Sequence, residues 1–151
     1  MIDQNYHSQS NGQQTGRLLM RGVCRYLRSC NYATIDEFAP AKGRRVDVMA
    51  LGPKGELWIV ECKSGRADFM SDNKWHEYLD WCDGYFWAVD LEFPVDLLPE
   101  HTGIMIADSY GAEIIRMASR RKLSAARRNV LVRKFARHAA MRLQMHIDPK
   151  L

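Results

Sequence analysis

Apolar and polar positions change their spacing along the chain, and each change marks an expected boundary between elements. Over residues 15–29, apolar residues recur every three to four positions, which is typical of an amphipathic helix. The turn sequences P-A-K-G and G-P-K-G then divide the next segment into three strands. We expect a helix over 15–29, strands over 32–38, 45–51 and 56–63, a helix over 67–82, a strand over 85–91, a strand pair over 102–107 and 113–117, and a final helix over 124–146.

The order of these elements predicts the fold class. The helix over 67–82 is long enough for a crossover, so the strand over 85–91 is expected to pair in parallel with the strand over 56–63. The hairpins before it pair antiparallel. We therefore predict an α/β domain over residues 15–151, with a mixed sheet flanked by helices, a C-terminal strand pair and a long basic helix. Residues 1–14 are predicted to be a disordered polar lead-in.

The final helix is expected to bury one stripe and to expose another. Apolar residues at helical spacing predict the buried stripe, and polar residues four positions apart predict a solvated ladder. The buried stripe is Val132, Phe135, Ala136, Ala139 and Leu143, and the ladder is Lys134, His138, Arg142 and His146.

Composition indicates one globular domain. The 151 residues are 46% hydrophobic and 26% charged, and no run approaches the ~18 apolar residues of a membrane span. The N-terminus lacks a signal pattern, so we expect a cytoplasmic protein without a membrane partner. Its four cysteines include no C-x-x-C pair and are expected to be free thiols.

The charge distribution is strongly asymmetric. Eleven of the 22 Lys and Arg residues lie between Arg116 and Leu151, beside a single acid, Asp148. A basic C-terminal third on an otherwise acidic body favours a polyanionic partner, and we expect DNA. A solvated helix face is the alternative.

Four charged residues are predicted to meet at one edge of the three-stranded meander. Glu61 and Lys63 share a face because side chains alternate along a strand. The turn near residue 54 places Asp47 opposite Glu61, and the turn near residue 42 places Glu37 opposite Asp47. A carboxylate cluster requires a cation or a shared proton, and hard oxygen ligands suit Mg²⁺ or Mn²⁺. With Lys63 beside it, such a site can hydrolyse a phosphodiester.

An exposed hairpin is the structural alternative for the same residues. Here Glu61 and Lys63 would form a cross-strand ion pair, or one that involves Arg45.

The stretch R-R-V-D-V-M-A-L-G-P-K-G-E-L-W-I-V-E-C-K-S resembles the core of the PD-(D/E)xK nuclease superfamily. From about Arg17 to Pro149, the chain resembles the MmcB-related bacterial DNA repair family within it. The closer likeness rests on A-D-F-M-S-D-N-K-W-H-E-Y, C-D-G-Y-F-W-A-V and L-L-P-E-H-T-G-I-M-I-A-D-S-Y-G-A-E-I. The resemblance implies a restriction-endonuclease-like α-β-β-β-α-β core, which agrees with the order predicted from the pattern.

The resemblance also implies roles for individual residues. Asp47, Glu61 and Lys63 become the catalytic residues, and Asp47, Glu61 and the Cys62 backbone carbonyl become ligands of Mg²⁺ or Mn²⁺. Glu37 is a further candidate ligand, because the superfamily often takes an acid from its first helix and residues 15–29 contain none. The proline of the motif is Val46 here. The candidate DNA contacts are Arg44, Arg45, Ser64, Lys74, Arg127, Arg128, Arg133, Arg137 and Arg142.

Three functions follow from these observations. The first is a metal-dependent DNA endonuclease of bacterial DNA repair, in which water near Lys63 attacks a phosphodiester. The second is a DNA-binding module that keeps the nuclease fold without cutting, within a repair complex. The third is a protein-interaction domain whose basic helix docks on an acidic surface. A repair-protein partner and a homodimer both stay open.

Overall fold

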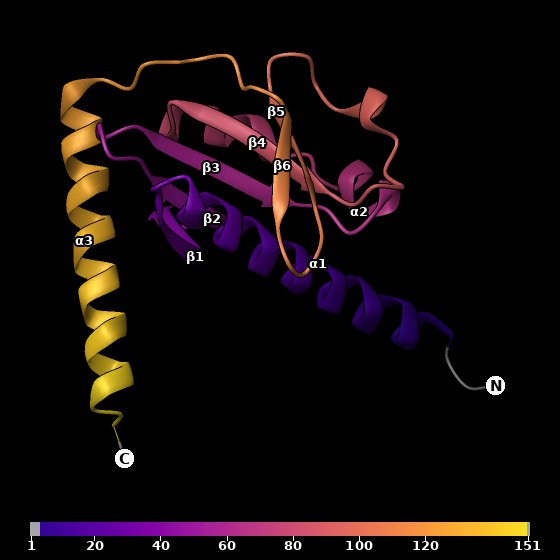
Figure 1. Ribbon diagram of the computed structural model, residues 1–151, viewed down its shortest axis with the longest axis horizontal. Coiled ribbons are helices and arrows are strands. Elements are labelled where there is room, and N and C mark those ends of the chain that lie inside the picture. Colours follow the sequence, from indigo (N-terminus) through magenta and orange to yellow (C-terminus); the bar gives the residue numbers. More distant parts are fainter. Residues whose placement is uncertain (1–3, 151) are drawn as a thin grey trace.

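The computed structural model describes residues 4–150, except for the side chains of residues 4–11 and 13. The chain forms one mixed sheet with helices on both of its faces (Figure 1). The elements are α1 (Gln4–Ser29), β1 (Ala33–Ala41), β2 (Arg44–Leu51), β3 (Leu57–Cys62), α2 (Arg66–Met70), the 3₁₀ helix η1 (Trp75–Trp81), β4 (Gly84–Val89), the 3₁₀ turn η2 (Val95–Leu97), β5 (Gly103–Ala107), β6 (Ala112–Arg116) and α3 (Ala125–Ile147).

The six strands lie in sequence order, β1-β2-β3-β4-β5-β6. The pairs β1–β2, β2–β3 and β5–β6 are antiparallel, whereas β3–β4 and β4–β5 are parallel. The predicted α/β class, the mixed sheet and the parallel pairing across the crossover are therefore confirmed. The final strand pair and the long C-terminal helix are also present.

Alternation along the central strands sends apolar side chains to both faces of the sheet. On one face, Val48, Val60 and Phe86 pack against the buried stripe of α1, which consists of Leu19, Val23 and Leu27. On the other face, Met49, Ile59 and Trp87 pack beneath α2, η1 and the first half of α3. Burying a side chain of this size contributes roughly 1.5–3 kcal/mol, so these two layers hold the domain together.

Close packing of α1 depends on Gly22. A Cβ atom there would lie 1.8 Å from the Asp108 carbonyl oxygen, which belongs to the turn between β5 and β6. Only glycine permits this approach of helix and hairpin.

The first helix is longer than predicted. It begins at Gln4 instead of Thr15, so residues 4–14 are helical where the sequence predicted a disordered lead-in. Once a helix has been nucleated by its packed turns, each further residue adds a hydrogen bond at little cost, and the polar stretch extends it. Residues 1–3 lie outside the described part of the chain.

The predicted continuous helix over 67–82 is wrong. The crossover breaks into α2 and η1 over residues 71–74. The Asp72 Oδ1 atom accepts hydrogen bonds from the backbone N–H groups of Lys74 and Trp75, both at 3.0 Å. Short polar side chains that accept hydrogen bonds from backbone N–H groups in this way compete with helical hydrogen bonds. Here this competition ends the helix.

The buried stripe of α3 was predicted only in part. Leu131 and Phe135 are buried, and Val132 and Ala139 are half-buried, but Ala136 and Leu143 are exposed. Periodicity predicts which face of a helix is apolar, but it does not predict how much of the helix packs against the core. The apolar contacts of α3 with the core run from Leu131 to Ala139, and the last turns of the helix extend beyond the sheet (Figure 1).

Candidate functional site

Asp47 and Glu61 lie side by side at the edge where β3 ends. Val48 pairs with Val60, so the next positions along β2 and β3 are Asp47 and Glu61. The Cys62 backbone N–H donates a 2.8 Å hydrogen bond to Asp47 Oδ2, which fixes the Asp47 carboxylate across the gap between the strands. The predicted neighbourhood of the two acids is confirmed. The Cys62 side chain is buried on the opposite face.

The Glu61 carboxyl group lies in an environment that disfavours its charged form. Burial raises its pKa well above the ordinary value, and the adjacent Asp47 carboxyl raises it further through a hydrogen bond and its charge. Two half-buried carboxylates in contact cannot both be ionised cheaply without a counter-charge. In the protein alone, the pair therefore retains a proton or requires a cation.

The proton on Glu61 predicts a pH dependence of stability in metal-free buffer. An acid whose folded pKa is raised contributes stability below its unfolded pKa, and this contribution is lost as the pH rises toward the folded pKa. We expect Glu61→Gln to remove this loss, so the variant should gain stability over the wild type as the pH rises from about 5 to about 8. Urea unfolding in the presence of a chelator measures the difference. An equal difference at both pH values would contradict the raised pKa.

Lys63 is held as a charged ammonium beside the acids. Its side chain is 10% exposed, and its Nζ lies 2.9 Å from Asp72 Oδ2 and 5.7 Å from the centre of the Trp87 ring. Burial opposes the charge, but the hydrogen bond and charge of Asp72, with the charges of Asp68 and Glu61, outweigh it and raise the pKa of Lys63. The ion pair expected in the alternative interpretation, between Lys63 and Glu61, is replaced by one with Asp72.

An open cavity of about 1070 Å³ gathers these side chains. Its wall also includes the N-terminal half of α1, which crosses the end of β3. The lining is formed by Gly12, Gly16, Arg17, Met20, Glu37, Arg45, Asp47, Glu61, Cys62, Lys63, Ser64, Ala67, Asp68 and Ser71. The sequence-predicted residues Glu37, Arg45, Asp47, Glu61, Lys63 and Ser64 thus share one cavity.

Glu37 occupies the position between two β1–β2 pairs, Asp36 with Val48 and Phe38 with Val46. Its register position is therefore opposite Asp47, as predicted, but the two residues are not a paired position of the sheet. The φ of 51° at Glu37 places its backbone in the left-handed region that is uncommon for residues other than glycine. Its side chain is exposed in the cavity wall. Among the described residues, no three His, Cys, Asp or Glu side chains are close enough together to hold a metal ion.

Ser64 is engaged within the protein. Its backbone N–H and its hydroxyl group donate to Asp68 Oδ2, at 3.0 and 3.2 Å. The first turn of α2 is thereby tied to the end of β3, with the hydroxyl group at the cavity wall.

Three of the predicted DNA contacts on α3 have structural partners. Arg128 forms two 2.6 Å hydrogen bonds with the buried Asp83 carboxylate, and Arg142 pairs with Asp36 of β1. Arg127 lies 4.4 Å from the centre of the Trp81 ring and donates to the Asp80 carbonyl oxygen. These contacts anchor α3 to the sheet, so the basic helix is not a uniformly free cationic face.

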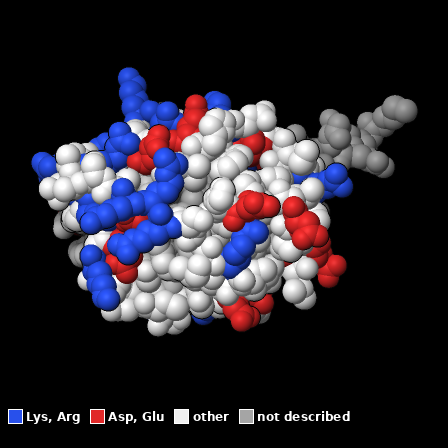
Figure 2. Space-filling model, turned by 90° about the horizontal axis from the view of Figure 1, so that it is seen from above, with Lys and Arg blue, Asp and Glu red and all other residues white. Residues whose placement is uncertain are grey.

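The remaining predicted cations are exposed, except Arg44, which is half-buried. Arg44 pairs with Glu77 at 3.1 Å, whereas Lys74, Arg133 and Arg137 form no ion pair with any described residue. Figure 2 shows that Lys and Arg side chains gather on the side of the molecule where α3 lies, and that several acids lie toward the other side.

Sequence reasoning missed Arg17 and Asp72. Arg17 lies in the cavity wall, on the helix in which PD-(D/E)xK nucleases often carry an acid. The G-x-x-x-G spacing of Gly12 and Gly16 was the sequence signal that this face of the helix carries no large side chains. Asp72 is the ion-pair partner of Lys63. No local pattern reports that pairing.

The fold and the cavity define an α/β protein that carries an acid–base cluster at the carboxyl end of β3. The chain belongs to the MmcB-like family, described as DNA repair protein MmcB-like, whose model matches residues 4–150. A solved structure of SPO1766, a protein of unknown function from Silicibacter pomeroyi, is similar with 61% identity and a TM-score of 0.87, over 89% of this chain and 92% of that chain. No curated protein matches the chain. No helix among the described residues is long and apolar enough to cross a membrane.

Proposed function

We propose that the protein is a metal-dependent deoxyribonuclease that acts in bacterial DNA repair. The observation that carries the proposal is the contact between the Asp47 and Glu61 carboxyl groups beside charged Lys63 in one open cavity. The order D…E-x-K resembles that of PD-(D/E)xK nucleases, and membership of a DNA repair family supports DNA as the partner.

The donor set fits Mg²⁺ or Mn²⁺. Both ions prefer hard oxygen ligands, and burial together with the adjacent Asp47 carboxyl group raises the pKa of Glu61 despite the nearby charge of Lys63. Asp47, Glu61 and the Cys62 carbonyl would hold the ion, with Glu37 as the further candidate across the cavity. When bound, the ion supplies Lewis-acid polarisation of a phosphoryl oxygen and acidifies water.

The protein's own residues would orient the DNA and stabilise charge. Because the pKa of Lys63 is raised, its ammonium group suits the negative charge that develops on the phosphate oxygens better than it suits proton abstraction. Arg17 and Arg45 lie in the cavity wall, where they would bind flanking phosphates.

Calorimetric titration with Mn²⁺ tests the site directly. We expect the wild type to bind the ion and Glu61→Gln to lose the signal, because the variant removes a ligand and the charge that the ion neutralises. Glu77→Gln is the matched control, since Glu77 is an exposed acid that pairs with Arg44. The same proteins are then incubated with single-stranded, branched and lesion-bearing DNA in Mn²⁺. Cleavage that persists in Glu61→Gln would exclude this site.

A DNA-binding module without cleavage is the second candidate. It is favoured by the lack of any acid in α1 and of a three-ligand cluster among the described residues. This function predicts salt-sensitive DNA binding in the absence of a calorimetric metal signal. Metal uptake that depends on Glu61 would argue against it.

A further inference from the structure

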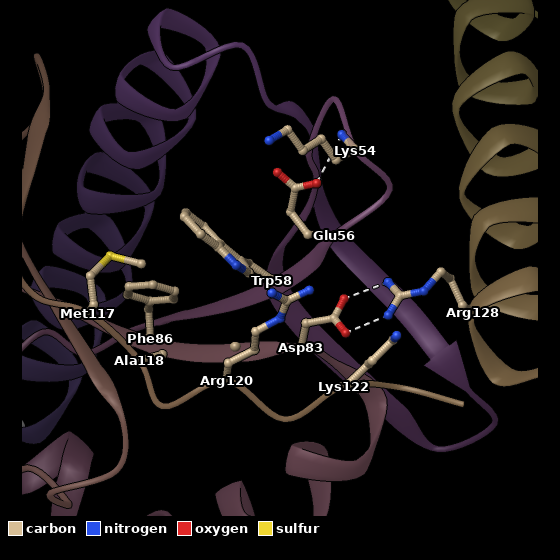
Figure 3. A pocket seen from close by; sticks show the side chains of 11 residues that line it. Lys54, Glu56, Trp58, Asp83, Phe86, Met117, Ala118, Arg120, Lys122 and Arg128 are labelled. Atoms are coloured by element: carbon tan, nitrogen blue, oxygen red, sulfur yellow. Dashed lines mark hydrogen bonds and ion pairs between the residues drawn. The ribbon is translucent and has the colours of Figure 1, made fainter. Parts of the chain in front are cut away.

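A second cavity lies at the opposite end of β3. It has a volume of about 460 Å³ and is enclosed by the turn before β3, the start of β4 and the segment that joins β6 to α3 (Figure 3). At about 3.3 Å per residue along β3, Glu56 in its wall is about 16 Å from Glu61, and none of its lining residues lines the first cavity. It is therefore separate from the cavity that holds Asp47 and Lys63.

The charge of this cavity is positive. Its two acids are already satisfied: Asp83 binds Arg128, and Glu56 accepts hydrogen bonds from the Tyr32 hydroxyl group and the Lys54 backbone N–H. Lys54, Arg120 and Lys122 are exposed and form no ion pair with any residue in the described part of the chain. In Figure 3, Arg120 and Lys122 extend from one segment, and Lys54 lies across Trp58 from them.

The floor of the cavity is apolar. The Trp58 ring stacks on Tyr32 with ring centres 4.4 Å apart, and its centre is 4.8 Å from that of Phe86. Met117 lies beside Phe86 and is 59% exposed, which is high for a large apolar side chain (Figure 3). A ligand that satisfies both halves of the site carries anionic groups on one side and a flat or apolar group on the other.

We propose that this cavity binds an unpaired nucleotide of single-stranded DNA. Its base would lie against Met117 and the edge of Trp58, beside the buried Phe86 ring, and the phosphates that flank it would lie against Arg120, Lys122 and Lys54. The volume falls within the range of about 300–1,000 Å³ typical of small-molecule sites, which admits one nucleotide. The bases of a duplex are stacked inside and cannot enter. The site is independent of cleavage and goes beyond the proposed nuclease activity.

Fluorescence anisotropy with a short labelled oligodeoxythymidylate in chelator tests this site. We expect Arg120→Ala/Lys122→Ala to weaken binding by about tenfold or more, because two charge-assisted phosphate contacts are lost. The matched control is Lys42→Ala/Lys150→Ala, which removes the same charge from exposed positions outside both cavities and should weaken binding less than about threefold, by loss of the general field alone. Equal losses in the two double variants would overturn the proposal.

Filling the cavity distinguishes binding inside the cavity from general electrostatic attraction to the protein surface. Ala118→Leu adds apolar volume at the wall without changing charge, and it should weaken oligonucleotide binding by about tenfold while duplex binding stays unchanged. Should this variant fail to fold, Met117→Glu places a carboxylate at the exposed rim and is expected to have the same effect. Wild-type affinity in the folded variant would overturn the site, as would equally tight binding of free thymidine monophosphate.

The outcome is distinguishable from that of the nuclease proposal. Glu61→Gln should bind the oligonucleotide as the wild type does, whereas Arg120→Ala/Lys122→Ala should keep its calorimetric Mn²⁺ signal. Loss of both properties in one variant would instead indicate unfolding, which thermal unfolding of that variant detects.

Discussion

Replacing Asp83 by alanine is expected to lower the free energy of unfolding by about 3–5 kcal/mol, the cost of breaking a buried ion pair from one side. Asp83 is 4% exposed, and its carboxylate binds the Arg128 guanidinium at two points. It also accepts hydrogen bonds from the backbone N–H groups of Leu57 and Leu123, at 2.8 and 3.0 Å. The variant therefore leaves a guanidinium and two backbone donors without their acceptor.

This expected loss is a large share of the roughly 5–15 kcal/mol that stabilises a typical domain. Urea denaturation measures it, and Asp80→Ala is the matched control. Asp80 pairs with Arg121 at the surface, where both side chains are more than half exposed, so its loss should cost less than about 1 kcal/mol. Similar losses in the two variants would show that Asp83 does not hold α3 and the first residue of β3 in place.

The same ion pair predicts sensitivity to acid. Burial opposes the charge of Asp83, but the hydrogen bonds from Arg128, Leu57 and Leu123 outweigh it and hold its pKa below the ordinary value. A carboxyl group of this kind contributes stability above its unfolded pKa, and this contribution is lost as the pH falls through the folded pKa. The Asp83 contribution therefore has the opposite sign from that of Glu61.

Replacing Lys63 by methionine is expected to reduce metal-dependent DNA cleavage by about 10²–10⁴-fold, the usual range for one catalytic group. The variant keeps most of the side-chain volume beside Trp87 but removes the ammonium charge that would stabilise the phosphate. DNA affinity should change little, because one cation among many in the protein is lost. Single-turnover cleavage and anisotropy binding measure the two effects separately.

Lys63 also neutralises the charge of Asp72, so the effect of the variant on cleavage must be distinguished from a loss of stability. The double variant Lys63→Met/Asp72→Asn removes both charges of the 2.9 Å ion pair and should recover stability without recovering cleavage. Lys74→Met is the matched control, because Lys74 is exposed and outside the cavity lining. Cleavage by Lys63→Met at the wild-type rate, or an equal loss in Lys74→Met, would remove Lys63 from the proposed mechanism.

The neighbourhood of Asp47 and Glu61 could be predicted because it depends on local geometry. A strand alternates its faces, and a short turn fixes which residues of a hairpin stand opposite each other. Glu37 was placed opposite Asp47 by the same argument, and the register agrees. The argument could not give its positive φ, since that depends on how β1 bends against its neighbours.

The break between α2 and η1 could not be obtained from periodicity. Apolar positions at helical spacing continue from Phe69 to Cys82. This pattern does not predict a side chain that accepts hydrogen bonds from backbone N–H groups and so ends the helix. Asp72 does this with one oxygen and binds Lys63 with the other, so the break and the ion pair have one cause.

The amino-acid sequence by itself determined the α/β class, the order of the strands and the carboxylate pair at the end of β3, because these follow from alternation, turn residues and short connections. The tertiary structure alone decided which charges are paired and which are free. Arg128 and Arg120 look alike in the sequence, yet one is bound to buried Asp83, 45 residues away in the chain, and the other is exposed at the rim of a cavity. Contacts between residues so far apart depend on how whole elements pack, and no local pattern encodes them.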